Sequence, residues 1–133
     1  MINDICETVA RDAASLLRAD HKLISALFAE YEKVLLKIKK KHLIAQICTN
    51  LTVYAQVEED IFYTAVKIAL KDIKFITEAM IEHATLKALI AQVEGKEPDG
   101  EMFDTKIKVL YEHVKHHVKG ERKKCFLRSE QLN

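Results

Sequence analysis

One stretch decides the fold: Leu51-Thr-Val-Tyr54-Ala-Gln-Val-Glu58-Glu59-Asp-Ile-Phe62-Tyr63. Its inward residues step by four and three along the chain, which is the spacing of a helix that packs one face into a core. The expected stripe is Ile47, Leu51, Tyr54, Glu58, Ile61 and Ala65. A phenol and a carboxylate therefore occupy positions that should be apolar. An unpaired carboxylate there costs several kcal/mol unless a partner charge, hydrogen bonds or a metal ion compensate it.

The composition indicates one helical domain. The chain has 133 residues, of which 49% are hydrophobic and 31% charged, with 3 Gly, 1 Pro and no Trp. This balance suits a single globular core, and the abundance of Ala, Leu, Ile, Lys and Glu favours helix almost end to end. We expect one domain over residues 1–133, with a short leading segment at 1–19 and a frayed tail at 127–133.

Charge and hydropathy exclude two classes of partner. The 21 Lys and Arg nearly balance the 20 Asp and Glu, and no basic stripe with interleaved aromatic residues suggests nucleic-acid binding. No apolar run approaches the roughly 18 residues needed to cross a bilayer, and the acidic N-terminus is unlike a signal peptide. The cysteines, at Cys6, Cys48 and Cys125, lack C-x-x-C spacing and are expected to be free thiols. We expect a soluble, cytoplasmic protein.

Four segments carry the same helical spacing. A short leading helix is expected to run into the first long helix, with an N-cap or a kink at Asp20. The long helix is expected to reach the basic cluster at 37–41, because cations suit a helix C-terminus. The other helices are expected at about 42–70, 73–95 and 100–126. Short connections between long amphipathic helices favour an antiparallel up-down-up-down four-helix bundle, so the predicted fold class is all-α.

Each of the four stripes is interrupted by side chains of the kinds that bind metals. A single histidine on an apolar face is most often a hydrogen-bonded core residue, but six interruptions, with at least one on every helix, are hard to explain in that way. Two pairs of them are spaced four residues apart, which places both members of each pair on one helix face. Two carboxylates with several N or O donors inside a bundle form the donor set of a di-iron or di-manganese site. The six residues are His21, Tyr54, Glu58, His83, His117 and Glu121.

Polar residues beside these positions are weaker candidates. Acidic side chains next to the ligand positions could orient imidazoles, although such side chains are usually charged groups exposed to solvent. The acids in question are Asp20, Glu59 and Glu82. His113 lies one turn before His117, where a partly exposed bundle histidine is favoured over a ligand. Tyr63 is expected to be a core or boundary aromatic residue.

These residues resemble those of the hemerythrin-like proteins with an HHE cation-binding domain, of the bacterial type. The matching segments are Leu17-Arg-Ala-Asp20-His21, the stretch from Leu51 to Tyr63, Glu82-His83-Ala-Thr-Leu86-Lys, and the segment from Leu110 to Glu121. The resemblance implies a four-helix bundle that holds two non-haem iron ions with an oxo or hydroxo bridge, with manganese the less favoured metal. It places the family's ligand positions at His21, Glu58, His83, His117 and Glu121.

The chain departs from the family pattern at Tyr54, where the family usually has histidine. Three interpretations stay open: Tyr54 binds iron as a phenolate, the position is left open, or the second metal site has been lost. A phenolate is a hard anionic donor, so its ligation would favour ferric iron.

The expected function is redox chemistry on a ferric pair, most simply catalase-like decomposition of hydrogen peroxide in defence against oxidative stress. An alternative is the binding or sensing of O2, nitric oxide or iron without turnover. A third is a bundle whose polar residues satisfy one another without metal. The partners are then small molecules, with neither nucleic acid nor membrane, and the protein is expected to be a monomer or a weak homodimer.

Overall fold

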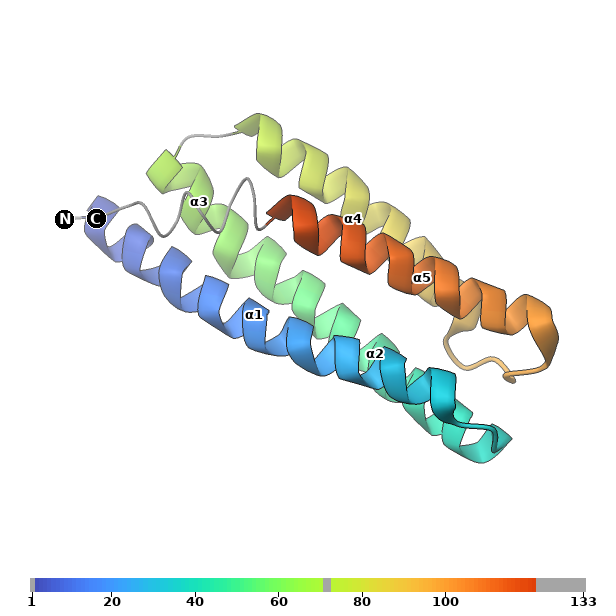
Figure 1. The fold of residues 1–133 in the computed structure, drawn as a ribbon. Coiled ribbons are helices and arrows are strands. Elements are labelled where there is room, and N and C mark those ends of the chain that lie inside the picture. Colours follow the sequence, from blue (N-terminus) through green and yellow to red (C-terminus); the bar gives the residue numbers. More distant parts are fainter. Residues whose placement is uncertain (1, 71–72, 122–133) are drawn as a thin grey trace.

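The structure, a computed structural model, describes residues 2–70 and 73–121, with side chains left undescribed at 2–14, 62, 65–66, 69–70 and 121. The helical elements are α1 (Ile2–Lys33), α2 (Lys37–Val57), η1 (Glu58–Phe62), α3 (Tyr63–Leu70), α4 (Ile73–Val93) and α5 (Gly100–Glu121). Because α2, η1 and α3 follow one another without a break, they form one long rod. The four rods run alternately up and down (Figure 1), which confirms the predicted all-α antiparallel bundle.

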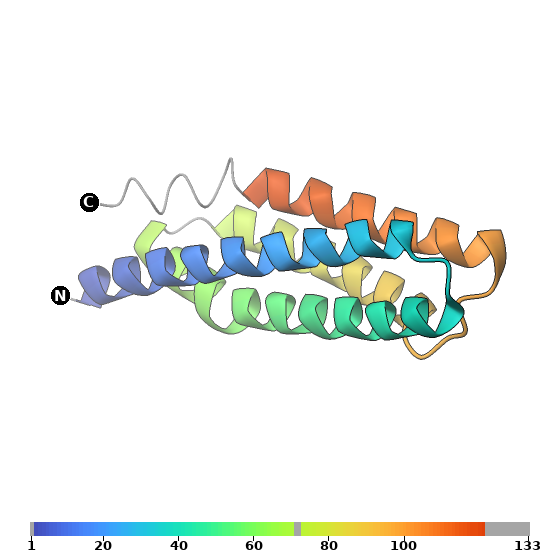
Figure 2. The ribbon, with the colours of Figure 1, turned by 60° about the horizontal axis from the view of Figure 1, so that its bottom comes forward.

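The rods enclose one core. Helix α1 packs against α2, η1 and α3, and α4 packs against α5; Figure 2 shows α1 and the α2–α3 rod side by side. The ring closes between α1 and α5, where Phe28 stacks on Tyr111 with ring centroids 4.5 Å apart. Side chains at the centre of this ring are therefore shielded from water by all four rods.

The inward-facing side chains of α4 and α5 form much of the core. In α4 the buried side chains are Ala79, His83, Leu86, Ile90 and Val93; in α5 they include Phe103, Ile107, Leu110, Val114 and His117. Burying each large aliphatic side chain contributes about 1.5–3 kcal/mol. No helix among the described residues is long and apolar enough to span a membrane.

The boundary between the first two helices differs from the prediction. Helix α1 passes through Asp20 without ending there and stops at Lys33, so the basic cluster at 37–41 forms the first turns of α2 instead of the end of α1. Leu35 lies in the connection and is 92% exposed. The predicted helix start at Asp20 and the predicted helix end at 37–41 are therefore wrong.

Acidic residues at the same end of the bundle explain why lysines are tolerated there. Cations at a helix N-terminus oppose its dipole, but Lys37 pairs with Asp99, and Lys41 lies 2.6 Å from Glu97. Lys40 Nζ lies 3.4 Å from Asp104. These acids are more than 50 residues further along the chain, so local sequence spacing could not reveal them.

The second departure lies in the deciding stretch itself. Element η1 is a single π-helical turn that takes one extra residue into the rod. The inward face is therefore shifted after Glu58: Ile61, expected inside, is 45% exposed, while Tyr63 is 2% exposed. The side chain of Ala65, the last member of the predicted stripe, lies outside the described residues.

Candidate metal centre

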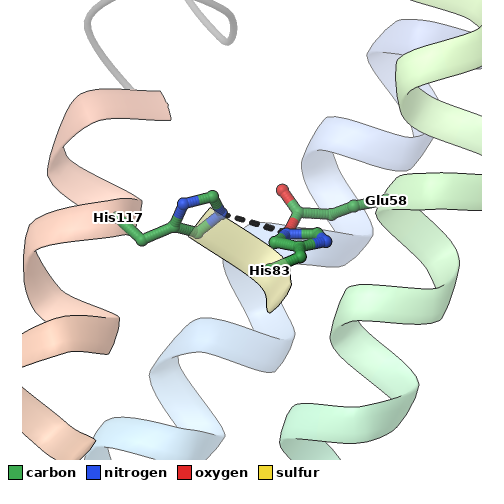
Figure 3. A group of neighbouring side chains, drawn as sticks. All are labelled: Glu58, His83 and His117. Carbon is green, nitrogen blue, oxygen red and sulfur yellow. Dashed lines mark hydrogen bonds and ion pairs between the residues drawn. The ribbon is translucent and has the colours of Figure 1, made fainter. Parts of the chain in front are cut away.

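Three rods each contribute one buried polar side chain to a common point in the bundle. Glu58 is the first residue of η1, His83 lies in the middle of α4, and His117 lies in the last part of α5. Their exposed fractions are 0%, 1% and 6%. Figure 3 shows the three side chains converging, with the two imidazoles facing the carboxylate. Each offers one ligand atom within 4.8 Å of the other two.

The three ligand atoms form a nearly regular triangle. His83 Nε2 lies 2.9 Å from Glu58 Oε1 and 3.3 Å from His117 Nε2, and the third edge, His117 Nε2 to Glu58 Oε1, is 3.4 Å. With metal–ligand distances of about 2.1 Å, neighbouring ligand atoms are about 3.0 Å apart in an octahedron and about 3.4 Å apart in a tetrahedron. The triangle therefore fits one face of a cation's coordination shell.

Each histidine faces a second carboxylate on its other side. His117 Nδ1 lies 2.6 Å from Glu82 Oε2, and His83 Nδ1, which has no hydrogen-bond partner, lies 3.7 Å from Glu59 Oε1. A carboxylate accepts hydrogen bonds, so the neutral form of His117 carries its hydrogen on Nδ1. This leaves the Nε2 lone pair directed into the triangle, as in metal-binding histidines braced by carboxylates. Of the acids weighed from the sequence, Glu59 and Glu82 thus lie against the imidazoles.

The electrostatics of this group favour a positive charge at its centre. Burial by itself would lower the pKa of His117, but hydrogen bonds and charge interactions with Glu58 and then Glu82 outweigh it and raise that pKa. A buried carboxylate is costly without a compensating charge. A proton on His117 supplies that charge in part, and a metal cation would supply it to all three atoms. The residues therefore fit a metal ion.

Tyr63 belongs to the same group, although the sequence indicated only a core aromatic residue. Its hydroxyl lies 3.2 Å from Glu58 Oε2 and 3.3 Å from His83 Nε2. In a regular α-helix residues five apart point about 140° away from each other, so helical spacing placed Tyr63 off the inward face. The aromatic pair at 62–63, four and five residues after an inward carboxylate, is a weak signal in the sequence.

The structure brings together three of the six predicted ligands. Among the described residues, the group of close ligand atoms contains Glu58, His83 and His117, and His21, partly buried on α1, lies outside it. Tyr54 is buried, at 3% exposed, one turn before Glu58. Glu121 is the last residue of α5, and its side chain lies outside the described residues.

The remaining histidines on these helices lie away from the triangle. His113 is partly buried, and its Nε2 lies 3.3 Å from the main-chain oxygen of Glu82. His42 and His116 are exposed. The described cysteine, Cys48, is a buried free thiol whose pKa is raised to about 11 by burial and by the charge of Glu94.

Comparison with known families identifies the class of protein. Residues 12–127 match the family model described as the hemerythrin HHE cation-binding domain. The chain therefore belongs to the hemerythrin HHE family, which confirms the resemblance drawn from its motifs. The family description and the buried Glu and His group agree that this bundle binds a metal cation.

One curated relative comes from Nostoc sp. (strain PCC 7120) and is named a DNA nickase. It is 26% identical to this chain over 111 residues, which cover 84% of this chain and 31% of the relative. The chain thus spans about a third of the length of that protein. No solved structure matches the chain significantly.

Proposed function

We propose that this chain is a non-haem iron protein that decomposes hydrogen peroxide. The observation that carries the proposal is the buried triangle of Glu58 Oε1, His83 Nε2 and His117 Nε2, whose edges measure 2.9, 3.3 and 3.4 Å. Two imidazoles and one carboxylate form the facial ligand set that holds non-haem ferrous iron with open positions. Open positions are what a small molecule such as peroxide needs in order to bind.

The proposed centre contains two iron ions with an oxo or hydroxo bridge, as the family resemblance suggests. The triangle would hold the first ion, and the second would be held by His21, Tyr54 and Glu121. Support for Tyr54 comes from its burial one turn before Glu58. If its oxygen is a ligand, ferric iron gives a visible phenolate-to-iron absorption band that disappears in Tyr54→Phe.

Peroxide decomposition is favoured over reversible oxygen carriage because of the donors around the site. Hard anionic oxygen donors favour ferric iron, whereas oxygen carriage needs a readily maintained ferrous state. Bound iron would supply the one-electron oxidation and reduction through which two molecules of peroxide give one of oxygen and two of water. The protein would hold its ligands in place, exclude bulk water through burial, and keep a proton on Tyr63 Oη beside Glu58.

The proposed setting is the cytoplasm, with a monomer or weak homodimer acting on small molecules. The DNA-nicking activity named for the Nostoc relative is not carried over, because the chain spans only 31% of that protein. The near-neutral formal net charge of +1 likewise gives no particular attraction to a phosphate backbone.

Oxygen evolution from hydrogen peroxide tests the proposal. We expect the iron-loaded protein to evolve oxygen, and Glu58→Ala to lower the rate at least about tenfold because a ligand is lost. His42→Ala, at an exposed position on α2, is the control and should keep both iron content and activity. If the iron-loaded protein evolves no oxygen, peroxide decomposition is wrong. A reversible spectral change with O2 or nitric oxide would then support the alternative, binding or sensing without turnover.

A further inference from the structure

The π turn gives Glu58 and Tyr63 a relationship that a regular helix would not allow. The main-chain N–H of Tyr63 donates to the carbonyl oxygen of Glu58, five residues back, instead of four. This wider turn brings Tyr63 to the inward face, next to Glu58. Both side chains are then almost fully buried, and the tyrosine hydroxyl donates to Glu58 Oε2 at 3.2 Å. π turns of this kind occur frequently at functional sites.

The two oxygens of Glu58 consequently have different partners. Oε1 faces the Nε2 atoms of His83 and His117 and forms one corner of the triangle, whereas Oε2 accepts the hydrogen bond from Tyr63. A carboxylate that bridges two metal ions must give one oxygen to each of them. The hydroxyl of Tyr63 already uses one lone pair of Oε2, so a metal at this oxygen must compete with the hydrogen bond, whereas Oε1 faces the triangle.

We propose that Tyr63 makes the two metal-binding steps unequal. The first ion binds to the triangle through Glu58 Oε1 and leaves the Tyr63 hydrogen bond intact. A second ion that uses Glu58 as a bridge must share Oε2 with that hydrogen bond or displace it, and therefore binds more weakly. Tyr63 is thus a positioning residue that acts through Glu58, and a form with a single metal ion is populated at limiting metal. This inference rests on the proposed metal function of the same site.

The expected size of the effect follows from the hydrogen bond. Hydrogen bonds to charged acceptors are worth about ten- to hundredfold in an equilibrium constant. Removing the hydroxyl should strengthen the second step by up to this factor. The first step should not tighten, because the hydroxyl is an outer partner of Glu58 and lies 3.3 Å from His83 Nε2, and both residues are ligands in that step. A purely structural role for Tyr63 would weaken both steps together.

Anaerobic titration of metal-free protein with cobalt(II) tests the inference, with bound metal measured by equilibrium dialysis and visible absorption. In the unsubstituted protein we expect one ion to bind first and a second to bind at least about tenfold more weakly or not at all. In Tyr63→Phe, which keeps the ring, the second step should appear or tighten about ten- to hundredfold. Helical content by circular dichroism verifies folding.

Tyr31→Phe is the matched control. It removes another hydroxyl-to-carboxylate hydrogen bond, 2.7 Å from Tyr31 to Asp104, at a site made by other residues of α1 and α5. Its titration should match that of the unsubstituted protein. Binding of two ions in one step by the unsubstituted protein, or an unchanged second step in Tyr63→Phe, would overturn the inference. Failure of the unsubstituted protein to bind even one ion would instead overturn the proposed metal function.

Discussion

Two groups of acidic and basic side chains link the same rods in opposite surroundings. The interior cluster, Glu58, His83 and His117, is at most 6% exposed. The connection-end cluster joins Lys37 and Lys41 at the start of α2 to Glu97 and Asp99 between α4 and α5, and its side chains are 52–67% exposed. Figure 1 shows the α1–α2 and α4–α5 connections at one end of the bundle. Water and salt screen charges there, but not inside.

The difference separates the two roles that charged groups have in this fold. Exposed ion pairs contribute little to stability, so the connection-end cluster mainly offsets the poor placement of lysines at a helix start. The interior cluster lowers the stability of the metal-free bundle, because charge is buried there without full compensation. Its position is explained by the cation that it binds and not by the fold.

The largest expected effect is on metal affinity, and it is tested by replacing one Glu with Gln in each cluster. Glu58→Gln should weaken metal binding by more than about a hundredfold, because even the outer partners of metal ligands are worth about 10- to 100-fold. Glu97→Gln, in the connection-end cluster, should leave the affinity unchanged. Competition titration against a chromogenic chelator measures both. Equal losses in the two variants would contradict the assignment of the triangle.

The next effect concerns the carboxylate behind His117. Glu82→Gln should weaken metal binding about 10- to 100-fold, because the Nδ1 hydrogen bond of 2.6 Å holds the ring and makes Nε2 a better donor. Glu101→Gln, an exposed change on the first turn of α5, is the control. If the metal affinity of Glu82→Gln lies within threefold of that of the control, the hydrogen bond between His117 Nδ1 and Glu82 does not contribute to metal binding.

Acidification should weaken metal binding through His117. Its pKa is raised in the metal-free protein, so a proton occupies the site at pH values above the ordinary 6.5 and must leave when metal binds. Apparent affinity should fall by up to about tenfold per pH unit as pH drops through the raised pKa. The stability that protonated His117 gives the metal-free protein has the opposite slope: it is full below pH 6.5 and is lost as pH rises through the raised pKa.

Affinity measured from pH 8 to pH 5.5, with thermal unfolding of the metal-free protein beside it, shows both slopes. In Glu82→Gln the fall in affinity should begin at lower pH, because one cause of the raised pKa is gone. A flat affinity profile in the unsubstituted protein would contradict proton competition at His117.

The smallest effect is expected at the connection end. Lys41→Met removes the 2.6 Å pair with Glu97, and since both side chains are more than half exposed the free energy of unfolding should change by less than about 1 kcal/mol. The change should shrink further in 1 M salt. Chemical denaturation at low and high salt measures it, and a large, salt-independent loss would mean that the pair does more than join the two connections.

The fold and the centre of the site were predictable because both follow helical spacing. His83 and His117 interrupt regular stripes of buried aliphatic residues on α4 and α5, so their inward direction could be read from the sequence. Glu58 was predictable for the same reason, since α2 stays regular up to that residue. Local periodicity was sufficient wherever the helix stayed α-helical.

Two features could not be read from periodicity. The extra residue of η1 changes the inward side after Glu58, so Ile61 was expected inside and Tyr63 was not recognised as a partner of the site. The lysines at the start of α2 pair with Glu97 and Asp99, which approach them only when the bundle is assembled. The first limit is one of helix geometry, and the second is one of distance along the chain.

The adjacency of Glu82 and His83 on α4 has a kinetic consequence. Glu82 braces the histidine of α5, while His83 belongs to the triangle itself. One local opening of α4 would therefore remove the ligand His83 and, at the same moment, the carboxylate of Glu82 that holds the ligand His117 in place. The rate at which a chelator removes the bound cation is then expected to follow the rate of amide hydrogen exchange in the middle of α4. Conditions that slow the opening of α4 should lower both rates.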